Sequence, residues 1–82
     1  MTEKEYRSLP GSDRLPLYDE NDPRCEQIAQ VRDPAYDTVR EATDLSDAHQ
    51  CLKDATLEFR GGIRYGADSG EKFVYAYFWK KR

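Results

Sequence analysis

The chain has 82 residues, of which 38% are hydrophobic, 35% charged and 12% aromatic. This length allows a single domain, and the aromatic content argues against a disordered chain because each aromatic side chain buries about 150–250 Å². No stretch approaches the roughly 20 apolar residues that cross a bilayer, and the first residues lack the basic-then-apolar order of a secretory signal, so we expect a cytosolic protein.

The net charge of −3 is unevenly distributed along the sequence. Residues 1–59 hold seven Lys and Arg against fourteen Asp and Glu, whereas residues 60–82 hold six against two. Such asymmetry is typical of proteins with two different contact surfaces, although an ordinary solvated face has the same composition.

Residues 1–20 show neither a helical nor a strand period. Pro10-Gly11-Ser12-Asp13 is a turn signal, and Pro16 would interrupt a helix through this stretch. We therefore expect an extended, partly mobile N-terminal arm over residues 1–20, followed by a single α+β domain over residues 21–82.

Two Asp-Pro pairs each offer a helix N-cap followed by proline at the first helical position. Asp22-Pro23 predicts a helix over about 23–31 with three residues on its inner side, namely Cys25, Ile28 and Ala29. Asp33-Pro34 predicts a second helix over about 34–43. The alternative is a strand over 36–43, since this segment contains the β-branched residues Thr38 and Val39.

The clearest element is an amphipathic helix that begins after Asp44, whose side chain can cap it. Its apolar residues recur in steps of three and four and share one stripe: Leu45, Ala48, Leu52, Ala55 and Phe59. Four carboxylates gather on a separate flank: Asp44, Asp47, Asp54 and Glu58. We expect the helix to span 44–60 and to end at Gly61-Gly62, with a strand over 57–60 as the alternative.

After the glycines the apolar period changes to two, which predicts strands over 63–65 and 72–80 joined by a loop over 66–70. The long strand has an aromatic row, consisting of Phe73, Tyr75, Tyr77 and Trp79, and a smaller row, consisting of Val74, Ala76 and Phe78. We expect the aromatic row to pack under the helix. In the alternative arrangement the smaller row does so, and the aromatic row faces solvent as a binding surface.

No arrangement of residues predicts catalysis, a cofactor or a metal ion. The single histidine, His49, diverges from Cys51 on the same helix and could reach only Cys25 as a thiol partner. These three residues supply too few ligands for a structural zinc site, and the glycines do not open a phosphate-binding loop. We therefore predict a protein that is not an enzyme, with two reduced thiols; a Cys25–Cys51 disulfide is the alternative.

The predicted fold is α+β, a small single domain with two or three N-terminal helices followed by a C-terminal antiparallel β-hairpin. Two surfaces are candidates for binding. The first is the aromatic row (Phe73, Tyr75, Tyr77 and Trp79), and the second is the acidic helix flank (Asp44, Asp47, Asp54 and Glu58).

The predicted function is binding of another protein without catalysis. Small inhibitors of this kind are common in phages and mobile elements, and that assignment rests on the size of the chain rather than on any residue. One alternative is binding of single-stranded nucleic acid by the aromatic row and the neighbouring Lys and Arg. Another is acidic mimicry of a nucleic acid by the helix flank. Self-association through the aromatic strand is a further alternative, and no membrane partner is expected.

Overall fold

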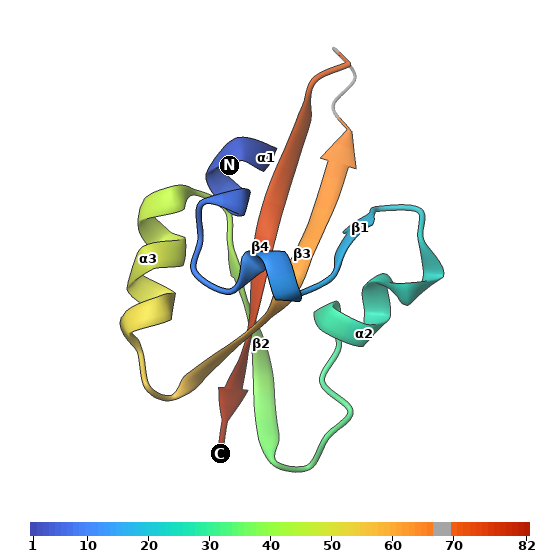
Figure 1. The fold of residues 1–82 in the computed structure, drawn as a ribbon. Helices are drawn as coiled ribbons and strands as arrows, with labels where there is room; N and C mark the ends of the chain where they lie inside the picture. The colour runs from blue at the N-terminus through green and yellow to red at the C-terminus, as the bar shows by residue number, and fades with distance from the viewer. Residues whose placement is uncertain (67–69) are drawn as a thin grey trace.

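The computed structural model describes residues 1–66 and 70–82 (Figure 1). Within these residues the chain forms a small single α+β domain with three α-helices and a four-stranded mixed sheet. The helical segments are α1 (Glu3–Arg7), α2 (Glu26–Ala29) and α3 (Leu45–Lys53), with 3₁₀ turns η1 (Ser12–Arg14) and η2 (Pro23–Cys25). The strands are β1 (Leu17–Asp19), β2 (Tyr36–Ala42), β3 (Leu57–Gly66) and β4 (Lys72–Lys81).

The strands follow the order β1-β3-β4-β2 across the sheet. Strand β1 runs parallel to β3, whereas the β3–β4 and β4–β2 pairs are antiparallel. The expectation of a simple C-terminal hairpin is therefore wrong, because β3 and β4 form the centre of a sheet whose outer strands come from the N-terminal half. Strand β4 has a neighbour on each side, and a core covers each of its faces, which explains why its sequence is apolar on both.

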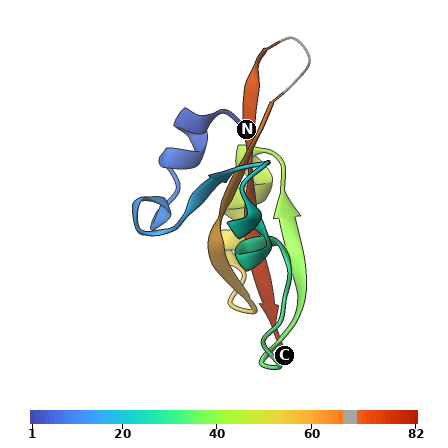
Figure 2. The same ribbon diagram turned by 90° about the vertical axis from the view of Figure 1, so that its right-hand side faces the viewer.

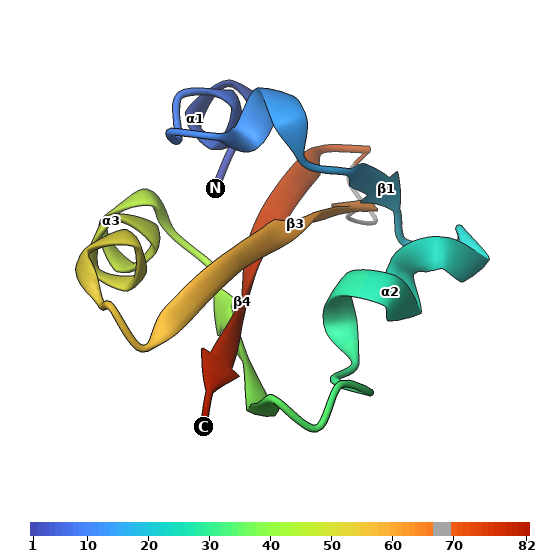
Figure 3. The same cartoon turned by 60° about the horizontal axis from the view of Figure 1, so that its bottom comes forward.

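The two faces of the sheet carry separate cores, and helices lie on both sides of it (Figure 3). One face, which we call the α3 face, carries the smaller row of β4 and packs against α1 and α3; its β4 residues are Val74, Ala76 and Phe78. The opposite aromatic face carries the aromatic row and packs against α2 through Ile28. The expectation that the aromatic row lies under the main helix is thus wrong, and the alternative placement of the smaller row is confirmed.

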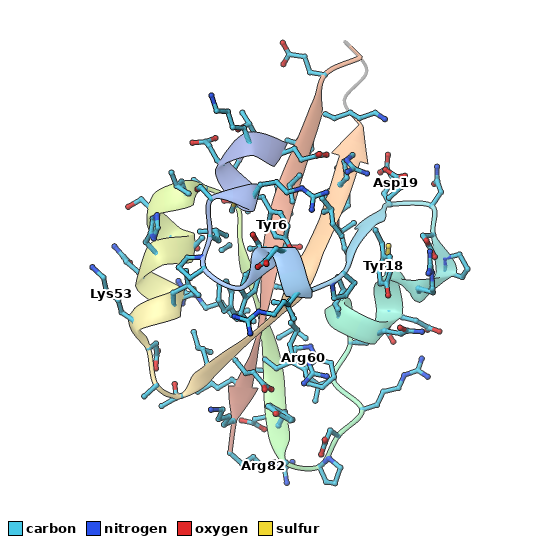
Figure 4. The ribbon with its side chains drawn as sticks, in the orientation of Figure 1. Tyr6, Tyr18, Asp19, Lys53, Arg60 and Arg82 are labelled. Atoms are coloured by element: carbon cyan, nitrogen blue, oxygen red, sulfur yellow. The ribbon has the colours of Figure 1, made fainter. Side chains whose placement is uncertain are left out.

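Residues 1–20 do not form the extended arm expected from the sequence. Thr2 and Glu5 form a capping box that begins α1, and Tyr6 and Leu9 are buried in the core of the α3 face. Figure 4 shows Tyr6 pointing from α1 toward the sheet. Strand β1 then pairs with β3, so this segment supplies both a helix and an edge strand.

The helix expected over 34–43 is instead strand β2, as in the alternative interpretation. Asp33 does accept a hydrogen bond from the backbone N–H of Ala35 at 2.9 Å, but this bond closes only a turn. The chain then becomes extended and pairs with β4 from Tyr36 to Ala42. The pairing satisfies the backbone groups on the side of the strand that faces β4, and the β-branched Thr38 and Val39 favour it.

The main helix begins after Asp44, as predicted, because the Asp44 side chain accepts a hydrogen bond from the backbone N–H of Asp47 at 2.7 Å. It ends at Lys53 rather than at residue 60. The Asp54 side chain binds both the N–H and the hydroxyl of Thr56, at 2.8 and 2.6 Å, which favours a turn over another helical step. Strand β3 then begins at Leu57, so the alternative expectation of a strand over 57–60 is confirmed.

The first Asp-Pro pair begins a helical segment, as expected, but the segment is shorter than predicted. The Asp22 side chain accepts a hydrogen bond from the N–H of Arg24 at 2.9 Å, and η2 and α2 follow in place of one helix over 23–31. Of the three residues expected on the inner side, Ile28 is buried in the core of the aromatic face, and Cys25 and Ala29 pack against that core half-buried. The loop expected over 66–70 falls in part on residues 67–69, which lie outside the described residues.

Candidate functional site

The aromatic row is divided into two halves because α2 covers only part of its face. The indole Nε1–H of Trp79 donates a hydrogen bond to the backbone oxygen of Ile28 at 2.9 Å, and Tyr77 packs in the same cluster as Ile28. Tyr77 is 4% exposed and Trp79 6% exposed. Phe73 and Tyr75 are only half-buried. The open half lies toward the end of β4 that extends beyond the helices (Figure 2).

Tyr65 of β3 joins the open half of the row. Its ring centroid lies 5.7 Å from that of Phe73 and 4.9 Å from that of Tyr75, and the Phe73 and Tyr75 centroids are 5.3 Å apart. We call these three half-buried side chains the aromatic platform. Tyr65 was predicted to lie in a strand over 63–65, without a role in binding. The alternation of side chains along β3, combined with the β3–β4 register, places Tyr65 opposite Phe73.

A chain of hydroxyl groups connects the platform to a carboxylate. The Tyr65 and Tyr77 hydroxyl oxygens are 2.5 Å apart, and Tyr77 donates to Glu41 Oε1 at 2.6 Å. Because the Tyr77 proton points to Glu41, Tyr65 donates to Tyr77. Burial raises the pKa of Tyr77 far above its ordinary value, and its bond to the Glu41 carboxylate raises it further. Burial also raises the pKa of Tyr65. These two phenols therefore remain neutral, and the charge at this end of the hydroxyl chain, beside the aromatic platform, is that of Glu41.

A guanidinium group lies on the covered half of the row. The Arg60 Cζ is 3.8 Å from the ring centroid of Trp79 and 5.7 Å from that of Tyr36. Arg60 Nη1 also donates to Glu58 Oε2 at 3.1 Å, and the hydroxyl of Tyr36 donates to the same carboxylate. The bond from Tyr36 is the main cause that lowers the pKa of Glu58, and Arg60 adds to it. Cation, ring and carboxylate thus form one unit.

A second guanidinium group lies on an aromatic ring of the same face. The Arg24 Cζ is 4.6 Å from the ring centroid of Tyr18 in β1, and Arg24 Nη2 is 2.8 Å from Asp22 Oδ2. Figure 4 shows Tyr18 and Arg60 on the side of the sheet that carries α2. The combination of ring, guanidinium and carboxylate therefore occurs twice on the aromatic face.

Two grooves run beside α2. One has a volume of about 350 Å³ and is lined by Glu26, Gln27, Gln30, Arg32 and Trp79. The other has a volume of about 330 Å³ and is lined by Leu15, Pro16, Gln27, Ile28, Glu58, Phe59 and Arg60. Gln27 borders both grooves. Their linings mix charged and apolar side chains, and the charges are already paired, Arg32 with Glu26 at 2.7 Å and Arg60 with Glu58 at 3.1 Å.

The four carboxylates of the expected acidic flank do not share one surface. Asp44 caps the start of α3, and Asp54 follows its end. Asp47 forms an ion pair with Arg40 of β2 at 2.7 Å. Glu58 lies in β3 rather than on the helix and contacts Tyr36 and Arg60 on the aromatic face. The flank was inferred from a helix over 44–60, and the shorter α3 separates its members.

Of the basic residues of the C-terminal segment, only Lys72 lies beside the platform, in a groove that it shares with Tyr65 and Glu20. Arg64 points to the α3 face, where Glu3 Oε1 and Asp19 Oδ1 lie 2.5 and 2.9 Å from its nitrogens. Residues 80–82 are exposed at the far end of β4. A strand rises about 3.3 Å per residue, so they lie on the order of 20 Å from the platform.

The two cysteines are free thiols on opposite faces of the sheet. Cys25 packs in the core of the aromatic face, and Cys51 is buried in α3 on the other side. Burial raises the pKa of both thiols. His49 is exposed on α3. Among residues 1–66 and 70–82, no group of three or more His, Cys, Asp or Glu gathers as metal ligands would.

None of the helices in the described part of the chain combines the length and the apolar character that a membrane span requires. Comparisons of the chain with protein-family models, with curated proteins and with solved structures gave no significant match.

Proposed function

We propose that this chain is a small protein-binding module that acts in the cytosol by surface contact, without catalysis, and modulates a larger protein. The aromatic face is the proposed contact surface. The observation that carries this proposal is the aromatic platform, in which Tyr65, Phe73 and Tyr75 cluster on a part of the sheet that α2 leaves open.

The composition of this face fits protein recognition. Tyr, Trp and Arg are the residue types most enriched among those that dominate the binding energy of protein interfaces. Tyrosine rings supply a large contact area at low entropic cost, because few torsions have to be fixed. The platform is held by the sheet and by the hydroxyl chain to Glu41, so little conformational freedom would be lost on binding.

The charges favour a protein over a nucleic acid. Binding of single strands requires cations beside the stacking rings, because phosphates follow every base. Here Glu41 borders the platform, and Lys72 shares the neighbouring groove with Glu20. Arg64 is engaged by two carboxylates on the opposite face, and residues 80–82 lie at the distant end of β4. The dispersed positions of the four flank carboxylates likewise give little support to acidic mimicry.

Affinity capture from cell extract with matched variants tests the proposal. The wild type should retain a defined protein that Phe73→Ala and Tyr75→Ala lose, while Gln50→Ala, an exposed change on α3, retains it. Circular dichroism would verify that each variant is folded, and binding would then be repeated with the purified partner. Capture that is indifferent to the platform would overturn the assigned surface. Capture abolished by nuclease treatment would favour the nucleic-acid alternative, and a concentration-dependent dimer lost in Tyr75→Ala would favour self-association.

A further inference from the structure

The aromatic face repeatedly combines an aromatic ring, a guanidinium group and a carboxylate. Arg60 lies 3.8 Å from the Trp79 centroid with Glu58 as its acidic partner. Arg24 lies 4.6 Å from the Tyr18 centroid with Asp22 as its partner. The ring quadrupole attracts the cation, and the carboxylate fixes the orientation of its planar N–H groups.

The aromatic platform has the rings and the carboxylate of this combination but lacks the guanidinium group. Its rings are clustered, and the Glu41 carboxylate lies at its border through the bonds Tyr65–Tyr77 and Tyr77–Glu41. Glu41 forms no ion pair with any Lys or Arg of the described residues, and none of those cations lies over the platform rings.

We propose that the aromatic platform binds an arginine side chain of a partner protein, with the guanidinium group against the rings of Tyr65, Phe73 and Tyr75 and with Glu41 as its counter-charge. This inference rests on the proposed function and names the chemistry that the partner must present. An exposed arginine on a strand or loop of the partner would satisfy it, since the platform lies at a projecting end of the sheet (Figure 2).

The other charges near the platform leave a balance that favours a cation. A groove of about 380 Å³ beside Tyr65 is also lined by Asp19, Glu20, Arg64 and Lys72. Arg64 is neutralised by Glu3 and Asp19, and Glu20 accepts a hydrogen bond from the N–H of Gly66 without a cationic partner among the described residues. Lys72 shares this groove with Glu20, which offsets its charge, and the Glu41 carboxylate on the other side of the platform is left without a cation from the described part of the chain.

Arginine fits this surface better than lysine does. The guanidinium group is planar and weakly hydrated, so it can lie flat on aromatic rings while its edge donates to a carboxylate. An ammonium group is a strongly hydrated point charge, and it would lose more hydration for fewer oriented contacts. Two guanidinium groups of this face, those of Arg24 and Arg60, already lie over an aromatic ring.

The experiment is an NMR titration of the isotope-labelled protein with a peptide of alternating glycine and arginine. The probe for comparison is the same peptide with citrulline, which keeps the planar shape and removes the charge. We expect the arginine peptide to shift the aromatic signals of Tyr65, Phe73 and Tyr75, and the citrulline peptide to leave them in place. A lysine peptide should bind more weakly than the arginine peptide.

Matched variants locate the counter-charge. Glu41→Gln should weaken binding of the arginine peptide roughly twofold to fivefold, the range of one exposed cation–π or ion-pair contact. Asp13→Asn removes the same charge at an exposed position on η1 and should weaken it less. Tyr75→Leu keeps an apolar side chain at the platform and should also reduce binding.

Equal shifts from the arginine and citrulline peptides, or equal effects of Glu41→Gln and Asp13→Asn, would overturn the arginine assignment. So would salt-dependent binding of a single-stranded oligonucleotide that Tyr75→Leu abolishes, because that result assigns the platform to stacking of bases. Capture of a protein through Phe73 and Tyr75 would survive these failures, so the inference and the proposed function can fail separately.

Discussion

The ring of Tyr6 lies directly on Gly62, where a Cβ atom would be 2.6 Å from Cε2 and 2.8 Å from Cζ of that ring. Tyr6 comes from α1 and is 0% exposed, and Gly62 belongs to the central strand β3. At the neighbouring Gly61, whose φ is 138°, a Cβ atom would lie 2.6 Å from the backbone oxygen of Pro16. The two glycines thus make the room in which the N-terminal segment docks.

Replacement of Gly62 by alanine should therefore destabilise the fold by about 1–3 kcal/mol, because the added methyl group displaces a buried ring. Gly66→Ala is the matched control in the same strand, since its Cβ atom would make only an ordinary contact of 3.5 Å with Glu20. We expect that control to change stability by less than about 0.5 kcal/mol. Urea unfolding followed by Trp79 fluorescence measures both, and equal losses would contradict the role of the Tyr6–Gly62 contact.

This contact explains why the sequence predicted an arm in place of a docked segment. A glycine pair after an apolar helical pattern normally indicates a helix end, and here it marks a bulge in a strand between Phe59 and Gly61. The binding site of Tyr6 exists only after β3 has paired with β4. The Thr2–Glu5 capping box is a local signal for the start of α1, but no pattern within residues 1–20 indicates that this helix docks on Gly62 or that β1 pairs with β3.

The residues of the candidate site were partly predictable. Alternation along β4 correctly separated the aromatic row from the smaller row, as the two cores show. Which row lies under the helix depends on strand order, because β2 supplies a second neighbour for β4 and α2 a cover for the far face. The roles of Tyr65 and Glu41 depend on register between strands, which the sequence pattern does not contain.

The start of α3 offers a prediction about capping. Asp44→Ala should destabilise the protein by about 1 kcal/mol, because the N–H of Asp47 loses its acceptor at 2.7 Å. Asp44→Asn should be close to the wild type, since asparagine caps as well as aspartate does. Chemical unfolding of the three proteins at neutral pH measures the difference. If both variants lost the same stability, the charge of Asp44 rather than its capping bond would be responsible.

The Arg60–Trp79 contact predicts a change in both stability and fluorescence. Arg60→Ala should cost about 1 kcal/mol and shift the emission of Trp79 to longer wavelength, because the indole loses its stacked cover and becomes more hydrated. Arg14→Ala, an exposed change on η1, should alter neither property. A double-mutant cycle with Glu58→Gln would show whether the ion pair at 3.1 Å contributes beyond the stacking. An unchanged emission spectrum in Arg60→Ala would contradict the stacked geometry.

Tyr6 predicts how stability depends on alkaline pH. Burial raises the pKa of Tyr6 from 10.0 to about 12, so the folded protein holds a proton that the unfolded chain releases. The contribution of Tyr6 is therefore fully present below pH 10.0 and is lost as the pH rises toward about 12. This difference in pKa corresponds to roughly 3 kcal/mol. The raised pKa of Tyr77 acts in the same direction.

Tyr6→Phe keeps the ring over Gly62 and removes the ionisable group. Among the described residues the Tyr6 hydroxyl makes a single, long hydrogen bond, 3.4 Å to the oxygen of Pro16, so its removal should lower stability at neutral pH by no more than about 1 kcal/mol. Above the ordinary tyrosine pKa of 10.0, the variant should lose less stability than the wild type. Tyr18→Phe, at a half-buried position, is the control and should follow the wild type. Parallel alkaline losses in Tyr6→Phe and the wild type would mean that another group governs the transition.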